Sequence, residues 1–301
     1  MNKNILPPFL WRLKYGTWMA CAIILCLSAF TMDPSPGDPH NEEIFLIVRA
    51  DDMGISQSTN QAVIESYRNG IVTSVEVLVP GPWFLDAVEL LREHPDLDVG
   101  LHLTLTSEWS RLKWRPISTS PSLVDSNGYL LPVIWEGTLF SEDQALRLQD
   151  WTIEDVEQEL RAQIEMGLTH IPDVSHISCH MGFQSLSPRV DELLISLAKE
   201  YQLIYKTELD RLDFKKDRNA DSYVPAFLNA LEKVGPGKYL FVEHPALDGP
   251  EMRSVYMASY LDVATDRQKV TDLFLDERVK TALGMKKITL MSYKDLENVG
   301  K

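Results

Sequence analysis

Short apolar runs alternate along this chain with segments whose apolar residues recur at helical spacing. From Glu43 onward the pattern predicts, in order, a strand at 44–50, a helix at 58–69, a strand at 72–79, a helix at 84–93 and a strand at 98–105. This repetition is typical of parallel strands joined by crossover helices. It predicts an α/β fold, built either as a barrel or as a doubly wound sheet.

A longer stretch without regular periodicity, residues 107–150, interrupts the alternation and is rich in Trp, Pro and Ser. Segments of this length between regular elements usually lie over the active face of the fold, so we expect an insertion there. Its aromatic residues Trp109, Trp114 and Tyr129 suit either stacking on a sugar ring or packing within the segment itself.

Regular elements resume after this stretch. Thr152 is placed to cap a helix that ends near Gly167. The pair Ser187-Pro188 is typical of the start of another helix. Strand-like runs follow at 238–245 and 286–293, and no interior linker separates these elements, so one domain is the simplest interpretation.

Three of the predicted strands carry residues that bind metals or transfer protons. The first ends in Asp51 and Asp52, another contains His102, and a third segment carries His176 and His180. In parallel α/β folds the side chains at strand ends face open space while the strands beneath hold them rigid. One aspartate and two histidines form a common ligand set for a catalytic metal, with positions left for water and substrate.

Each of these residues also has a structural interpretation. An aspartate after a strand often caps the next helix, and His102 alternates with apolar neighbours as a core histidine does. His176 and His180 are four residues apart, which on an extended strand separates them by roughly 13 Å. Only one of the two is therefore expected to be a metal ligand.

The adjacent acids can divide the work, one binding the metal and the other serving as base beside a water molecule. Neighbouring residues of a strand point to opposite faces. Asp51 and Asp52 therefore serve one site only where the strand bends, and Gly54 supplies that freedom. His244 precedes Pro245, which favours extended geometry. This histidine either protonates a leaving group or simply ends a strand.

Charge limits the partners. The formal net charge of -15 is spread along the chain, which argues against nucleic acid and against anionic lipid surfaces as partners. Small neutral or cationic substrates agree better with this negative charge. The sequence also allows a homodimer.

The N-terminal residues differ from the rest of the chain. Basic residues precede an apolar run at 18–30, and a Pro/Gly/Asp-rich stretch follows it, in the order typical of a secretory signal peptide. The run is short beside the roughly 17 to 25 residues of a permanent span. We predict a signal peptide or N-terminal anchor at 1–32, a linker at 33–43 and export to the periplasm or the outside of the cell. If the leader is not cleaved, we expect the protein to contact a membrane through this N-terminal segment only.

The number of cysteines predicts an exported domain without an internal disulfide. Two of the three cysteines, Cys21 and Cys26, lie in the leader, so the exported chain keeps only Cys179. On an extended strand the side chain of Cys179 faces away from that of His180. We therefore expect a packed core thiol rather than a metal ligand.

Taken together, these segments resemble the YdjC-like family of carbohydrate deacetylases, which includes the chitooligosaccharide deacetylases. The motifs shared with that family are Ala-Asp-Asp-aromatic-Gly, in which Met53 replaces the usual aromatic residue, Gly-Leu-His-Leu-x-Leu-Thr at 100–106, Ser-Asn-Gly at 126–128 and the pair His244-Pro245. The resemblance covers about residues 44–298.

A further family motif, Thr-His-x-Asp-Ser-His, is altered in this chain. Ser175, Ser178 and Cys179 replace its Thr, Asp and Ser. In this alignment His180 takes the metal-ligand position and His176 a supporting one. The missing carboxylate at position 178 removes a candidate partner for a ligand.

The resemblance implies a distorted TIM-like (β/α) barrel over residues 44–299. It implies one divalent metal ion, Mg or Zn with Mn or Co as alternatives, bound by Asp52, His102 and His180. Asp51 becomes the general base and His244 the acid, and which of the two aspartates is the base stays open. The implied reaction is removal of acetyl groups from N-acetylated sugars or oligosaccharides.

Two alternatives remain on the same fold. The first is a metal-dependent esterase or a glycoside hydrolase. A glycosidase needs two opposed carboxylates, and the candidates are Glu108, Glu243 and Glu251. The second alternative is a carbohydrate-binding relative without catalysis, a hypothesis motivated by Ser178 and Met53.

Overall fold

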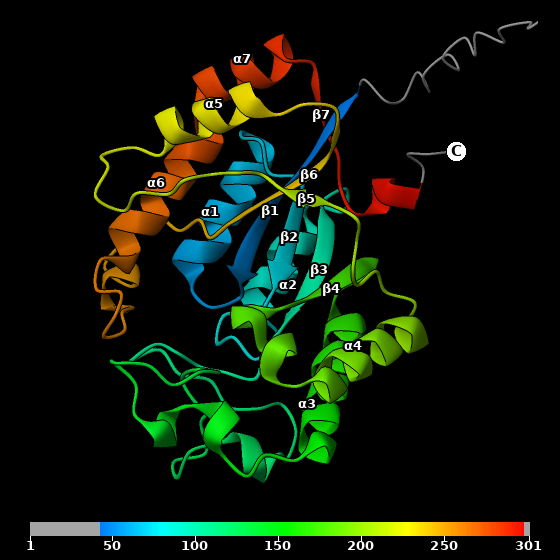
Figure 1. The fold of residues 1–301 in the computed structure, drawn as a ribbon, viewed down its shortest axis with the longest axis vertical. Helices are drawn as coiled ribbons and strands as arrows, with labels where there is room; N and C mark the ends of the chain where they lie inside the picture. The colour runs from blue at the N-terminus through cyan, green and yellow to red at the C-terminus, as the bar shows by residue number, and fades with distance from the viewer. Residues whose placement is uncertain (1–42, 298–301) are drawn as a thin grey trace, which may run out of the picture. The chain divides into compact units, whose positions relative to one another are not determined.

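The computed structural model describes residues 43–297 (Figure 1). The predicted signal peptide or anchor at 1–32 lies outside the described residues, as does almost all of the predicted linker at 33–43. Within the described range, no helix is long and apolar enough to cross a membrane.

Parallel strands form the centre of the structure. They are β1 (Ile44–Met53), β2 (Ser74–Val77), β3 (Asp98–Leu103), β4 (Val174–Cys179), β5 (Asp210–Arg211), β6 (Gly237–Glu243) and β7 (Ile288–Leu290). The sheet runs in the order β4-β3-β2-β1-β6-β5, and β7 pairs with the start of β1. β1 is thus central, and its last eight residues are all buried, as expected of a parallel strand covered on both faces.

A short segment links the two outer edges of this sheet. Ile204 forms a parallel bridge with His176 of β4, and a few residues later β5 pairs with β6. The strands therefore curve into a distorted barrel rather than an open sheet. The α/β class predicted from the alternation is confirmed, and a distorted barrel describes the arrangement well.

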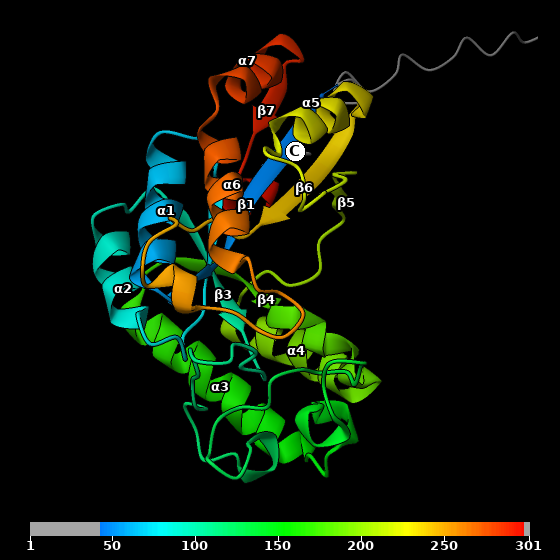
Figure 2. The same ribbon diagram turned by 90° about the vertical axis from the view of Figure 1, so that its left-hand side faces the viewer.

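The helices connect and cover the strands. They are α1 (Gln57–Arg68), α2 (Phe84–Arg92), α3 (Ile153–His170), α4 (Pro188–Tyr201), α5 (Val224–Lys233), α6 (Val263–Leu275) and α7 (Glu277–Met285). In both views α5, α6 and α7 gather beside β1 and β6, whereas α3 and α4 lie next to β3 and β4 (Figures 1 and 2). Residues 104–152, between β3 and α3, contain only short 3-10 turns and isolated bridges.

The predicted helix starts are confirmed. The side chain of Thr152 accepts a hydrogen bond from the backbone of Asp155, and Ser187 caps α4 with Pro188 as the first helical residue. The predicted end at Gly167 is wrong, because α3 continues to His170. Gly167 instead allows α3 to approach β3, since a Cβ there would lie 2.6 Å from the side chain of Leu101.

Charged groups fill part of the barrel interior. Arg49 Nη1 lies 3.2 Å from Glu76 Oε1, and His176 Nε2 lies 3.0 Å from the same oxygen. The ring of His176 stacks on Tyr293 with the centroids 3.7 Å apart. Gly100 makes room for this ring, because a Cβ at position 100 would lie 2.4 Å from His176 Nε2.

We predict that Gly100→Ala destabilises the fold by about 1–3 kcal/mol, because the added methyl group would displace a packed and paired ring. The free energy of unfolding from urea titration measures the effect. Gly284→Ala is the matched control, since a Cβ at this exposed position in α7 meets nothing within 4 Å. The control should gain about 0.5–1 kcal/mol. A Gly100→Ala protein as stable as the wild type would contradict the packing described.

Candidate metal centre

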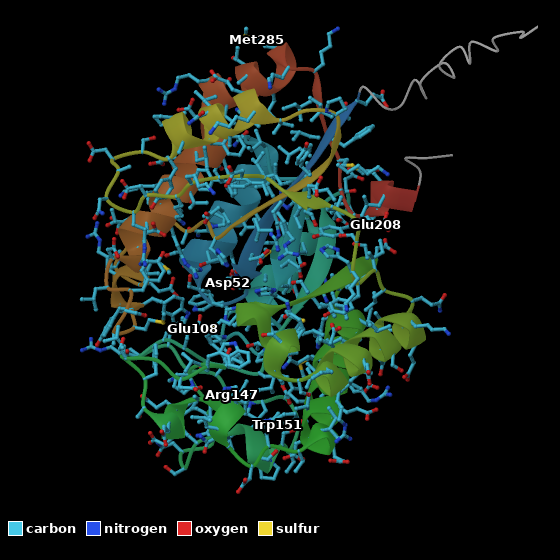
Figure 3. All side chains as sticks on the ribbon, viewed as in Figure 1. Asp52, Glu108, Arg147, Trp151, Glu208 and Met285 are labelled. Atoms are coloured by element: carbon cyan, nitrogen blue, oxygen red, sulfur yellow. The ribbon has the colours of Figure 1, made fainter. Side chains whose placement is uncertain are left out.

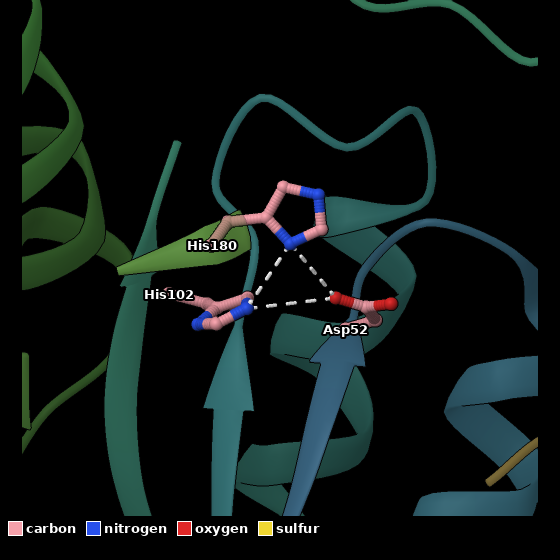
Figure 4. Close-up of side chains that lie close together, drawn as sticks. All are labelled: Asp52, His102 and His180. Atoms are coloured by element: carbon pink, nitrogen blue, oxygen red, sulfur yellow. Dashed lines mark hydrogen bonds and ion pairs between the residues drawn. The ribbon is translucent and has the colours of Figure 1, made fainter. Parts of the chain in front are cut away.

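Three side chains from three different elements converge at the carboxyl ends of the strands. Asp52 lies near the end of β1, His102 lies in β3, and His180 directly follows β4. His180 Nδ1 lies 3.4 Å from Asp52 Oδ1 and 3.2 Å from His102 Nε2, and His102 Nε2 lies 3.6 Å from Asp52 Oδ1 (Figure 4). We call these residues the Asp-His-His cluster. All three are buried, and one ligand atom from each lies within 4.8 Å of the others.

The backbone of β1 bends where the cluster needs it. Asp52 has φ of 71°, in the left-handed region that residues other than glycine rarely adopt. The register of β1 against β2 shifts between Ala50 and Met53. The bend expected from the adjacent acids is therefore present, and it falls on Asp52 itself, two residues before Gly54.

Asp52 has one oxygen bound and one available. Its Oδ2 accepts a hydrogen bond of 2.6 Å from Arg267 Nη2, whereas Oδ1 is buried without a hydrogen-bond partner among the described residues. Burial alone would raise the pKa of Asp52, but the positive charge of Arg267, followed by that of His244, holds this pKa well below its usual range. A charged carboxylate with an unpartnered oxygen suits a divalent cation.

The two histidines present opposite ring nitrogens to the cluster. His102 directs Nε2 toward it, while its Nδ1 lies 2.7 Å from Ser178 Oγ. His180 directs Nδ1 toward it, while its Nε2 lies 3.0 Å from Glu108 Oε2. The carboxylate that the family motif has at position 178 is missing, yet the serine hydroxyl still gives His102 a partner.

The two buried imidazoles differ in pKa: that of His102 is lowered and that of His180 is raised. Burial lowers the pKa of His102, which keeps this ring neutral and able to bind a metal. It would also lower the pKa of His180, but the negative charges of Glu108 and Asp52 outweigh it and raise this pKa to about 10. A cation that binds through His180 must therefore displace a proton.

Asp51 lies beside the cluster, within a separate ion pair. Its carboxylate accepts hydrogen bonds of 2.7 and 2.8 Å from Arg49, and its Oδ2 lies 3.8 Å from His102 Nε2. Burial would raise the pKa of Asp51, but the charge of Arg49 outweighs it and lowers this pKa. The residue is a charged carboxylate next to the ligands, as a general base must be. Its assigned role stays a prediction.

A cavity of about 350 Å³ opens beside the cluster. Asp52, His180, His244 and Glu108 all line it, and Figure 3 places Asp52 and Glu108 on the same side of the molecule. His244 is 39% exposed at its side chain, with Nδ1 4.0 Å from Glu243 Oε2. This position is open to a substrate, although the acid role also stays a prediction.

The sequence did not single out Arg267 of α6. Its guanidinium is buried, binds Asp52 and lies over Trp109, 5.3 Å from the ring centroid. A signal was present, because Arg267 shares the spacing of Val263 and Val270 on the buried face of the helix. A charged residue on such a face needs a buried partner.

The aromatic residues of the irregular segment divide between the two expected roles. Trp114 is buried and donates its Nε1–H to Thr106 O, so it packs the segment. Tyr129 lies under the guanidinium of Arg115, 4.5 Å away. Trp109 lines the cavity and is the aromatic residue of the three placed to meet a ligand.

His176 and Cys179 lie outside the Asp-His-His cluster, and His180 lies within it. His176 is buried beside Glu76 in the barrel interior, so only His180 of the pair belongs to the cluster. Cys179 lies with Sγ 3.9 Å from the hydroxyl of Tyr205. Cys179 is half-buried against the core rather than within it, and burial of its thiol raises the pKa to about 12. It lies outside the Asp-His-His cluster.

Parallel strands whose carboxyl ends meet beside a cavity are typical of an α/β enzyme, and the buried Asp-His-His cluster could hold a metal ion. The sequence matches the family described as "YdjC-like protein" over residues 45–284, and the chain belongs to this family. The resemblance seen in the motifs is thereby confirmed.

Two curated relatives and one solved structure are similar to this chain. "Carbohydrate deacetylase 1" of Listeria innocua serovar 6a is 29% identical over 263 residues, which cover 83% of this chain and 99% of the relative. A "Carbohydrate deacetylase" of Brevibacillus brevis is 35% identical over 169 residues, covering 52% and 57%. A crystal structure from Enterococcus faecalis V583, described as a "putative cellobiose-phosphate cleavage protein", superposes with a TM-score of 0.67 at 25% identity, covering 85% and 99%.

We predict that Ser178→Ala weakens binding of a divalent cation about tenfold or more, because His102 would lose the partner that fixes its ring. Competition with a chromophoric chelator measures the dissociation constant. Ser141→Ala, an exposed serine in the irregular segment, is the control and should bind like the wild type. Equal affinities for wild type and Ser178→Ala would show that Ser178 does not orient the ligand.

The Cys179 thiol of the leaderless chain should react slowly with Ellman's reagent at pH 8. A pKa raised from 9.0 to about 12 lowers the thiolate fraction about a thousandfold at that pH. The native rate should rise roughly tenfold per pH unit up to about pH 11, whereas the urea-unfolded chain should react fast at pH 8. Cys179→Ser supplies the background rate. A native thiol that reacts at pH 8 as fast as the unfolded one would disprove the assignment.

Proposed function

We propose that this protein is a metal-dependent hydrolase that removes acetyl groups from N-acetylated sugars or oligosaccharides. The observation that carries the proposal is the buried Asp-His-His cluster beside a cavity, in which Asp52 Oδ1 faces both histidines without a hydrogen bond among the described residues. Membership in the YdjC-like family supports it, since curated relatives are named carbohydrate deacetylases.

Asp52, His102 and His180 are the residues that would hold one divalent cation. Two imidazoles and one carboxylate favour zinc, and they also admit magnesium, manganese or cobalt. When bound, such a cation polarises the acetyl carbonyl and lowers the pKa of a water molecule.

The neighbouring residues supply the proton transfers. Asp51, kept charged by Arg49, accepts a proton from the attacking water molecule. His244 on the cavity wall donates a proton to the departing nitrogen as the carbon–nitrogen bond breaks. Water is thereby added across the amide, and the products are acetate and a free amine.

The glycoside hydrolase alternative is weakened by the partners of its candidate carboxylates. Glu108 is bound to His180, and Glu243 accepts a hydrogen bond of 2.8 Å from Lys216. Glu251 accepts a hydrogen bond of 3.1 Å from the backbone of Ser58 at the start of α1. An esterase would use the same groups as a deacetylase. Amide and ester substrates must therefore be compared to separate the two activities. A relative that only binds carbohydrate could keep the same ligand set, so it differs from the deacetylase in releasing no acetate.

Export belongs to the proposal as well. The order of basic flank, short apolar run and polar stretch at residues 1–32 supports a cleaved leader, with an N-terminal anchor as the alternative. The proposed substrate is then an oligosaccharide met outside the cytoplasm.

Acetate release from N-acetylglucosamine oligosaccharides tests the proposed function, with acetylated xylan and 4-nitrophenyl acetate as ester substrates beside them. The leaderless protein should release acetate from the amides, lose this activity with a chelator and regain it with added cation. Asp51→Asn and His180→Ala should lower kcat/KM at least 100-fold. Glu65→Gln, at an exposed position on α1, is the control.

Two results would contradict the proposal. Activity that a chelator does not reduce would remove the metal from the reaction. Activity confined to the ester substrates would favour the esterase alternative.

A further inference from the structure

His180 is oriented by a carboxylate from outside the strands. Its Nδ1 faces Asp52 and His102, while the other ring nitrogen points away from them (Figure 4). This second nitrogen, Nε2, lies 3.0 Å from Glu108 Oε2. An imidazole whose two nitrogens have different partners is fixed in its rotation, and the hydrogen bond at one nitrogen leaves the other nitrogen to bind a cation.

Glu108 is itself held in place before any ligand arrives. Glu108 is buried, with 5% of its surface exposed. The preceding residue, Ser107, donates its N–H to Leu131 O, accepts at its hydroxyl from Trp114 N, and accepts at its carbonyl from Lys113 Nζ. The residue before Glu108 is therefore held by two backbone hydrogen bonds and one through its side chain.

We propose that Glu108 is a positioning residue for the metal: it accepts the Nε2–H of His180, so that the lone pair of Nδ1 faces the cation. The inference rests on the proposed metal site. A charged acceptor makes a stronger hydrogen bond than a neutral one, so His180 is held more firmly than His102, whose partner is the hydroxyl of Ser178. Ligand histidines commonly depend on such a carboxylate, and its loss costs about 10–100-fold in metal affinity.

Glu108 also lines the cavity, so direct action on the substrate is the competing role. The contact with His180 favours positioning, because it engages the carboxylate of Glu108 from the ligand side. The two roles differ in what they alter. Positioning changes cation affinity and the coordination spectrum, whereas action on the substrate changes turnover alone.

Calorimetric titration of the metal-free, leaderless protein with Zn²⁺ tests the inference. Glu108→Ala should bind about 10–100-fold more weakly than the wild type. Glu108→Gln should lose less, because its amide oxygen can still accept the Nε2–H and the side chain keeps its size. Glu136→Gln, an exposed glutamate in the same irregular segment, should bind like the wild type. Circular dichroism and the urea midpoint without metal confirm that each variant is folded.

The visible spectrum of the Co²⁺-loaded proteins gives a second readout. The bands should shift in Glu108→Ala, because the His180 ring is free to turn, and should stay close to those of the wild type in Glu108→Gln. Wild-type affinity and spectrum in both variants would overturn the positioning role, and so would lost turnover with unchanged affinity. A wild-type protein that binds no cation would overturn the proposed function and this inference together.

Discussion

The left-handed turn of the backbone at Asp52 is the constraint on which the site depends. In a regular strand Asp51 and Asp52 would face opposite sides, and only one of them would reach the ends of β3 and β4. With φ of 71°, Asp52 brings its carboxylate to the two histidines while Asp51 stays 3.8 Å from His102. Such a conformation costs free energy, which the surrounding contacts must offset.

Two buried arginines make this concentration of acids tolerable. Arg49 binds Asp51 and lies close to Glu76, and Arg267 binds Asp52 from α6. A buried charge without a partner is strongly unfavourable, so each carboxylate keeps its charge only because a guanidinium lies beside it. The same ion pairs leave one oxygen of Asp52 without a partner, and this is the oxygen that faces the histidines.

Sequence reasoning found the residues whose position follows from their own strand. Asp52, His102 and His180 each lie at or near the end of an apolar run, and parallel strands carry their ends to one edge. Strand spacing also showed that only one of His176 and His180 belongs to the cluster, and the resemblance to the family then selected His180. The end of α3 at Gly167 was misread, because it depends on local packing, and the bend in β1 includes Asp52 as well as Gly54, whose φ is 104°.

Groups that reach the site from other elements were not predictable in this way. Arg267 comes from a helix far along the chain, and its pairing with Asp52 exists only after the barrel has formed. Glu108 was noticed as an acid, yet its contact with His180 depends on how residues 104–152 fold back over the strands. The spacing on α6 indicates that Arg267 is buried, but nothing in the sequence indicates that its partner is Asp52 or that the partner of Glu108 is His180.

The central place of β1 also has a consequence for how the chain reaches its native state. β1 is the first of the described strands along the chain, yet its residue Ile44 pairs with Gly237 and with Ile288, which come much later in the sequence. The sheet is therefore incomplete until β6 and β7 are available, and pairing over such separations slows folding. Until then an apolar strand with unpaired backbone groups stays open to aggregation. Chaperone protection of the nascent strand is thus a demand set by the order of the strands.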